Sequence, residues 1–278
     1  MLKSFNWAYA NMITSKRVAK IEAEEPALRL AVLIDADNAQ AAVIEGILGE
    51  VARFGEATVK RIYGDFTSPC SASWKKVLQK YAIKPVQQFA YTTGKNATDS
   101  TLIIDAMDLL YTRRFDGFCL VTSDSDFTGL ATRIREEGLM VLGFGEQKTP
   151  DAFRSACNKF VLTDLLRPAP AETILATDMS EPAVAPALPP AAAVTQAAAH
   201  SIPQEFMLSA LNQSSDENGW AHLGTFGSYL TKLQPDFDAR AYGFRKLSDL
   251  VRSHQDIFVT EERAVPGQAQ KQLYVKPR

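Results

Sequence analysis

Acidic residues directly follow apolar segments at two places in this 278-residue chain. Asp35 follows LAVLI and Asp124 follows GFCLVTS, and each is doubled by a second aspartate, Asp37 and Asp126 respectively. Asp99 stands at the expected start of the helix that precedes GFCLV. Ligands of open α/β sheets bind beyond the carboxyl ends of the strands. We therefore expect these carboxylates to meet at one edge of a sheet.

Several carboxylates that converge on one point repel each other unless a cation neutralises them. Hard oxygen ligands of this kind suit Mg²⁺ or Mn²⁺. An ion held this way can lower the pKa of its bound water and polarise a phosphodiester. None of the three histidines precedes residue 200, so chemistry at Asp35 must run without histidine.

Simpler roles stay open for several of these polar residues. Three of them also stand where a helix cap would: Asn38, Asp99 and Asp126. Asp65 follows a glycine and is predicted to serve a turn. Asp105 and Asp108 are expected on the solvated side of a helix. Ser123, next to Asp124, and Lys95, in the loop before Asp99, are candidates for substrate contact.

Apolar segments of strand length alternate with helical patterns along residues 28–166. Strands are predicted at 30–34, 57–63, 83–89, 117–122, 139–143 and 159–162, and the helices at 38–53, about 71–81, 100–111, 127–137 and 150–157. This alternation predicts an α/β domain of three layers with a central, mostly parallel sheet. Pro85 places the third strand near an edge.

The composition divides the chain into four segments. Residues 1–27 are an amino-terminal extension, and residues 28–166 form the α/β domain. Residues 167–200 contain 12 alanines and 6 prolines and are predicted to be a linker. Residues 201–278 show three apolar helix faces and a terminal hairpin, which predicts a small winged-helix domain.

The overall charge is nearly balanced, with 30 Lys and Arg against 32 Asp and Glu. This balance does not indicate an overall basic surface for binding nucleic acid. The three cysteines form no CxxC motif, which fits a reducing compartment, and we expect a cytoplasmic protein. No apolar segment approaches the ~20 residues needed to cross a membrane, so no membrane partner is expected.

Residues 28–165 resemble an NYN domain of the LabA-like group within the PIN-like nuclease superfamily. The resemblance rests on VLIDADN, KNATDSTLIIDAM and LVTSDSDFTGLATRIREEG. It implies a Rossmann-like PIN fold and a metal-dependent ribonuclease site with RNA as substrate. By matching position, Asp35, Asp99 and Asp124 would be the metal-binding, catalytic acids, with Asp126 the fourth. Asn38 would orient the first acid or the substrate.

Residues from about 202 resemble an OST-HTH/LOTUS domain. The signal is GTFGSYLTKLQPDFDARAYGFRKLSDLVRSH and the terminal LYVKP. The resemblance implies RNA binding or docking of a protein partner. Nine basic and nine acidic residues follow residue 200, so phosphate-driven affinity should be modest. Four basic residues could form a local patch on the third helix, although a solvated helix face explains them equally well: Arg240, Arg245, Lys246 and Arg252.

Two other functions remain open from the residues alone. A PIN-like fold could hold RNA or a partner without cleaving it, but the presence of all four acids favours catalysis. A haloacid-dehalogenase-type phosphatase is suggested by Asp35-Ala-Asp37, which mimics its DxD pair. That family has Thr or Val two residues after the second aspartate, where this chain has Ala39.

Overall fold

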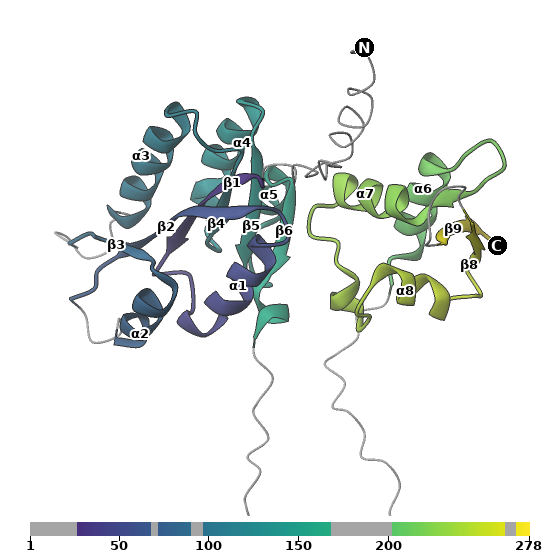
Figure 1. Cartoon of the computed structure of the whole chain (residues 1–278), viewed down its shortest axis with the longest axis horizontal. Coiled ribbons are helices and arrows are strands. Elements are labelled where there is room, and N and C mark those ends of the chain that lie inside the picture. Colours follow the sequence, from purple (N-terminus) through teal and green to yellow (C-terminus); the bar gives the residue numbers. More distant parts are fainter. Residues whose placement is uncertain (1–26, 68–71, 90–96, 168–201, 265–270) are drawn as a thin grey trace, which may run out of the picture.

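A six-stranded parallel sheet forms the centre of the first domain. The computed structural model describes residues 27–67, 72–89, 97–167, 202–264 and 271–278. The strands are β1 (Arg29–Asp35), β2 (Glu56–Gly64), β3 (Lys84–Gln87), β4 (Gly117–Val121), β5 (Met140–Gly145) and β6 (Lys159–Leu162). Their order is β3-β2-β1-β4-β5-β6, and every pair is parallel. The predicted parallel sheet, with the Pro85 strand at its edge, is confirmed (Figure 1).

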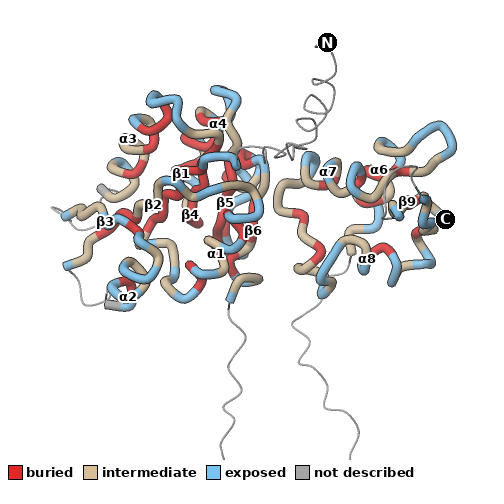
Figure 2. The backbone as a smooth tube through the Cα atoms, viewed as in Figure 1, coloured by how far each residue is buried: buried red, intermediate tan, exposed pale blue. Residues whose placement is uncertain are grey.

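Helices cover both faces of this sheet and complete the three layers. One face carries α1 (Ile44–Val51) and α2 (Ala72–Tyr81), and the other carries α3 (Ala97–Tyr111), α4 (Thr128–Glu136) and α5 (Asp151–Ala156). Each face has its own apolar cluster, because successive residues of a buried strand point to opposite sides. Buried residues accordingly run through the centre of the domain (Figure 2).

The strand order reverses direction between β1 and β4. Doubly wound sheets bind ligands in the crevice at this switch point, beyond the carboxyl ends of the two strands. Asp35 is the last residue of β1, and β4 ends at Val121, three residues before Asp124. The topology thus brings the two acidic segments side by side although 89 positions separate them in sequence.

The helix after β1 begins later than expected. Asn38 was predicted as a possible cap, but α1 begins at Ile44 and is preceded by the 3-10 helix η1 (Ala41–Val43). The residue that precedes η1 is Gln40, whose side chain makes no capping hydrogen bond. The cap interpretation of Asn38 is therefore wrong, which leaves its side chain available for another role.

Asp105 corrects the expectation of a solvated side of α3. Its carboxylate accepts hydrogen bonds from the Tyr63 hydroxyl and the Arg61 guanidinium, both of β2. Burial is the main cause that raises the pKa of Tyr63, and the Asp105 carboxylate adds to it. Asp105 therefore fixes α3 against the sheet, whereas Asp108 is exposed.

The second domain contains three helices and a small antiparallel sheet. The helices are α6 (Gln204–Ser214), α7 (Leu223–Leu233) and α8 (Leu247–Ser253), and the sheet has the order β7-β9-β8, with β7 (Ala221–His222), β8 (Phe258–Arg263) and β9 (Gln272–Pro277). Both strands of the predicted hairpin are present, and β7 is an addition to it. Helices and sheet enclose one apolar cluster that includes Phe226, Leu250 and Val275.

The third helix is shorter than its apolar pattern predicted. The pattern from Tyr242 to Val251 is divided between the 3-10 helix η5 (Ala239–Tyr242) and α8. Gly243 separates them with a φ of 84°, a left-handed conformation that favours glycine and ends a helix. Arg240, Arg245 and Lys246 consequently lie outside α8, so the predicted patch on one helix is wrong for these three residues, and only Arg252 lies on it.

The second domain lies against the β6 edge of the first domain (Figure 1). Phe160 of β6 donates its backbone N–H to the carbonyl oxygen of Pro235, with an N···O distance of 2.9 Å. Arg154 of α5 forms an ion pair with Asp236 at 3.1 Å, and both side chains are largely buried. The segment after α7 thereby joins the two domains. Within the described residues, no helix has the length and apolar character needed to span a membrane.

Candidate active site

Asp35 is fully buried at the end of β1, with 0% of its surface exposed. Its Oδ2 accepts hydrogen bonds from Asn38 Nδ2 at 2.8 Å and from Thr122 Oγ1 at 2.9 Å, and its Oδ1 accepts one from the Asp37 backbone N–H at 3.0 Å. Burial raises the pKa of Asp35, and the hydrogen bonds from Asn38 and Thr122 oppose that rise. The carboxylate is therefore held in one orientation by its own loop and by β4.

Thr122 is a site residue that the sequence pattern did not predict. It is buried directly after β4, donates to Asp35 and accepts a hydrogen bond from the Asp124 backbone N–H at 3.2 Å. One hydroxyl thus connects the two acidic segments across the switch point. The only indication in the sequence is that a polar residue directly follows GFCLV. An ordinary strand end explains that position equally well.

Asp124 caps the 3-10 helix η3 (Ser125–Phe127), which continues into α4. Its Oδ1 accepts a hydrogen bond from the Asp126 backbone N–H at 3.0 Å. The cap interpretation offered for Asp126 therefore belongs to Asp124. A capping aspartate uses one side of its carboxylate for the backbone, and the two oxygens together retain further acceptor capacity.

Three carboxylates meet beside this cap. Single oxygen atoms of Asp99, Asp124 and Asp126 all lie within 4.8 Å of one another. Asp99 comes from the first turn of α3 and the other two from the loop after β4. Asp35 is outside this group of three, but after burial its charge is the largest influence on the pKa of Asp99. Burial and the surrounding acids raise the pKa of Asp99 to about 6.

This cluster has the chemistry of a divalent-cation site. Three carboxylates from two separate elements present hard oxygen donors toward one another, and burial together with the neighbouring negative charges raises the pKa of Asp99. Such a set is stabilised when a cation lies among the oxygens. The residues present therefore fit Mg²⁺ or Mn²⁺, with Asp99, Asp124 and Asp126 as the oxygen donors and the buried carboxyl of Asp35 beside them.

Asp99→Asn should make the metal-free protein more stable at pH 8. The pKa of Asp99 rises from 3.8 to about 6 in the folded protein, so folding disfavours the ionised carboxyl. The folded state loses stability as the pH rises from about 4 to about 6, and the loss is complete above that range. Solvent screening of this partly exposed group and the favourable dipole of α3 reduce the gain to about 1 kcal/mol.

Urea unfolding in EDTA at pH 8 and pH 4.5 measures the difference in free energy of unfolding between Asp99→Asn and wild type. This difference should be smaller at pH 4.5. Asp108→Asn, an exposed acid on the same helix, is the control and should change little. With Mg²⁺ present the order should reverse, because only the wild type would gain stability from the ion. If Asp99→Asn is less stable than wild type in EDTA at pH 8, the ionised Asp99 does not destabilise the folded protein.

The other predicted site residues lie in different settings. Ser123 is buried, and its hydroxyl accepts a hydrogen bond from the Glu146 backbone N–H at 2.9 Å. Asp37 is exposed. Asp65 serves the predicted turn, since it accepts hydrogen bonds from the backbone and hydroxyl of Thr67. Lys95 lies outside the described residues.

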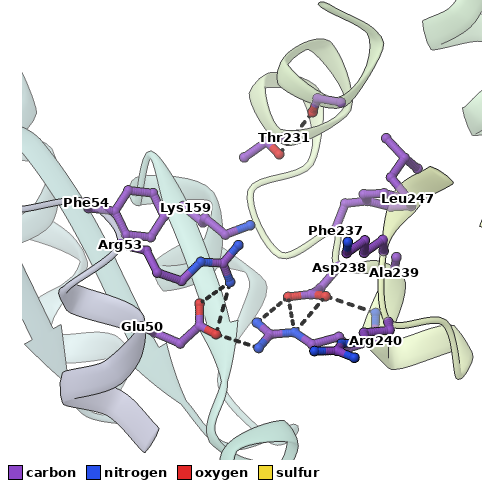
Figure 3. Close-up of a pocket in the computed structure, with 13 residues that line it drawn as sticks. Glu50, Arg53, Phe54, Lys159, Thr231, Phe237, Asp238, Ala239, Arg240 and Leu247 are labelled. Carbon is purple, nitrogen blue, oxygen red and sulfur yellow. Dashed lines mark hydrogen bonds and ion pairs between the residues drawn. The ribbon is translucent and has the colours of Figure 1, made fainter. Parts of the chain in front are cut away.

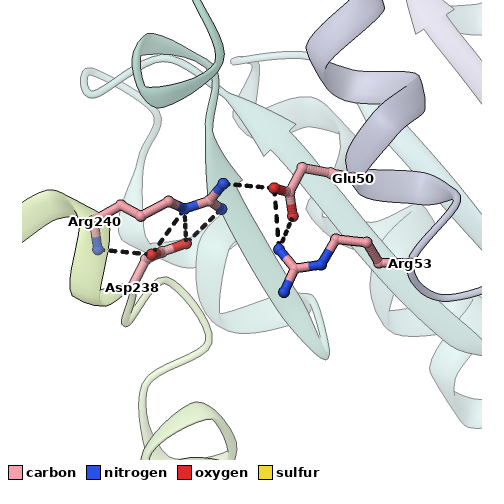
Figure 4. Close-up of polar contacts among 4 residues, drawn as sticks. All are labelled: Glu50, Arg53, Asp238 and Arg240. Atoms are coloured by element: carbon pink, nitrogen blue, oxygen red, sulfur yellow. Dashed lines mark hydrogen bonds and ion pairs between the residues drawn. The ribbon is translucent and has the colours of Figure 1, made fainter. Parts of the chain in front are cut away.

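The four basic residues predicted for nucleic-acid binding are not equivalent. Arg240 bonds to Asp238 of its own domain and to Glu50 of α1, so it joins the two domains (Figures 3 and 4). Arg252 pairs with Glu262 at 2.7 Å on the exposed surface. Arg245 and Lys246 are exposed, and no described residue forms an ion pair with them.

Comparison with known proteins divides the chain in the same way. A family model described as "NYN domain" matches residues 29–165, and one described as "OST-HTH/LOTUS domain" matches residues 201–269. No curated protein matches. An uncharacterized protein of Nitrosomonas europaea, solved by NMR, is 52% identical over 36% of this chain and 92% of its own, with a TM-score of 0.28. A Vibrio parahaemolyticus protein of unknown function is 18% identical over 50% of this chain and 94% of its own, with a TM-score of 0.43.

Proposed function

This chain is an NYN-domain protein with a carboxyl-terminal OST-HTH/LOTUS domain, and on that premise we propose that it is a Mg²⁺- or Mn²⁺-dependent ribonuclease. An NYN domain implies a PIN-like nuclease, and an OST-HTH/LOTUS domain suggests RNA binding. One observation supports metal-dependent cleavage: oxygen atoms of Asp99, Asp124 and Asp126 lie within 4.8 Å of one another at the switch point of the sheet.

Each acid has a distinct task in this proposal. Asp99, Asp124 and Asp126 would hold the ion, which when bound supplies an activated water and polarises the phosphodiester. Asp35, expected from the sequence as a further ligand, lies outside this group of three, and Asn38 and Thr122 hold its carboxylate in place. Thr122 also fixes the backbone of Asp124. Asn38 and Thr122 are therefore positioning residues rather than groups that touch the substrate.

The buried state of Asp35 argues against the phosphatase alternative. A DxD phosphatase needs its first aspartate as a nucleophile that reaches the phosphorus atom. Asp35 is 0% exposed, and both of its oxygens accept hydrogen bonds from the protein. These features support a role for Asp35 beside the neighbouring acids and do not fit a nucleophile that attacks a substrate.

Metal-dependent RNA cleavage by the purified full chain tests the proposal. End-labelled single-stranded and hairpin RNAs are incubated with protein in EDTA, in Mg²⁺ and in Mn²⁺. Cleavage should occur only with an added ion, since crowded carboxylates alone provide no activated water. RNA that is bound but uncut under all three conditions would support the non-catalytic binding alternative. Cleavage that persists in EDTA would contradict the metal requirement.

A further inference from the structure

A cavity of about 330 Å³ lies between the two domains, far in sequence from the acidic cluster. We name it the interdomain cavity. Its first-domain wall comes from the end of α1 and from β6, and its second-domain wall comes from α7, η5 and the start of α8 (Figure 3). Phe54, Phe237 and Leu247 provide apolar surface. Its volume falls at the low end of the ~300–1,000 Å³ typical of small-ligand pockets.

The lining of this cavity has an excess of positive charge. Five basic residues and two acidic ones line it: Arg53, Lys159, Arg240, Arg245 and Lys246, with Glu50 and Asp238. Both carboxylates are already neutralised, because Glu50 pairs with Arg53 and Arg240, and Asp238 pairs with Arg240 (Figure 4). Three positive charges remain, on Lys159, Arg245 and Lys246, and no described side chain pairs with them.

Lys159 is the most constrained of the three. It begins β6, and its side chain extends from the sheet edge toward the second domain (Figure 3). Burial lowers the pKa of its ammonium group, the nearby Asp238 charge opposes that effect, and the Arg240 charge adds to it. A half-buried cation without an ion-pair partner is costly, and an anion in the cavity would reduce this cost.

We propose that the interdomain cavity binds a phosphate group, with Lys159, Arg245 and Lys246 as its charged contacts. Three unpaired cations from two domains favour a multiply charged anion over a single carboxylate. Lysine and arginine both bind phosphate oxygens, arginine through two parallel hydrogen bonds. The phosphate could belong to an RNA strand or to a free nucleotide, and the RNA source rests on the proposed function. A ligand here would contact both domains at once.

The binding of AMP and of a single-stranded RNA oligonucleotide tests this site. Affinities are measured in EDTA, where metal-dependent cleavage cannot interfere, by calorimetry for AMP and by fluorescence anisotropy for RNA. Arg245→Gln/Lys246→Gln should weaken binding by about tenfold or more, since hydrogen bonds to charged groups are lost. The matched control is Arg278→Gln/Lys271→Gln, which removes the same two charge types at exposed positions of the same domain outside the cavity. Lys159→Met, which should also remove the cost of burying a charge, provides a second variant.

Each outcome supports or overturns the proposal. Loss of AMP affinity alone identifies a free nucleotide, loss of RNA affinity alone identifies an RNA phosphate, and loss of both identifies their shared phosphate. For RNA, the magnitude of the slope of log affinity against log salt should also decrease by about 0.7 per lost phosphate contact. An equal loss of affinity in the control variant, or no loss of affinity in either cavity variant, would overturn the proposed phosphate site. Because the measurement needs no cleavage, failure of the ribonuclease proposal would appear separately.

Discussion

Asp124→Asn is expected to reduce metal-dependent RNA cleavage by roughly 10²–10³-fold, the usual effect of removing one group that stabilises a transition state. Asp124 contributes an oxygen to the cluster with Asp99 and Asp126. Asparagine caps helices as well as aspartate does, so the hydrogen bond from the Asp126 backbone N–H can persist. The substitution therefore removes a negative charge while the local fold is kept. Initial rates of RNA cleavage at saturating Mn²⁺ measure the effect.

Asp151→Asn provides the matched control for this experiment. Asp151 is an exposed acid in the first turn of α5, so the same chemical change occurs at another helix start. Its cleavage rate should stay within about twofold of wild type, as expected for an exposed surface change. If Asp124→Asn cleaves RNA as fast as Asp151→Asn does, the acidic cluster is not the catalytic site.

Arg240→Gln should loosen the contact between the domains by about 2–3 kcal/mol, below the roughly 3–5 kcal/mol of a fully buried pair. Arg240 is 27% exposed and bonds to Glu50 at 2.5 Å and to Asp238 at 2.7 Å, whose side chains are only 8% and 12% exposed. The hydrogen bond to Asp238 is the main cause that raises the pKa of Arg240. The neutral variant leaves both carboxylates in place without their shared partner.

Small-angle X-ray scattering should show a larger radius of gyration for Arg240→Gln, and calorimetry should show earlier unfolding of the second domain. Arg252→Gln is the control, because its pair with Glu262 lies within the second domain at an exposed position. Exposed pairs of this kind contribute about 0–1 kcal/mol. Scattering curves that superimpose for Arg240→Gln and wild type would show that this ion pair does not hold the domains together.

The strand pattern of the first domain was predictable because buried parallel strands are short and nearly continuous in apolar residues. The ends of these strands then placed Asp35 and Asp124 at one edge, and the helix pattern placed Asp99 in the first turn of α3. These inferences need only local sequence and the general rule that ligands bind at carboxyl strand ends.

The side-chain partners that the sequence did not predict are distant along the chain. Asp105 looked solvated because its partners, Arg61 and Tyr63, lie more than 40 positions away on β2. Thr122 looked like a strand end because its hydrogen bond to Asp35 spans 87 positions. Arg240 looked available for RNA because Glu50 is 190 positions distant. Side-chain pairs between distant segments depend on how the elements pack, which a local pattern does not contain.

Each edge of the six-stranded sheet lacks one free backbone N–H for pairing with a further strand. Pro85 in β3 has no backbone N–H to offer, and the N–H of Phe160 in β6 is already bonded to Pro235 of the second domain. Unpaired edge strands are templates for pairing between copies of a protein and hence for aggregation. The second domain thus covers part of the β6 edge. A chain that ended before residue 202 would expose β6, whose KFVL sequence suits intermolecular strand pairing.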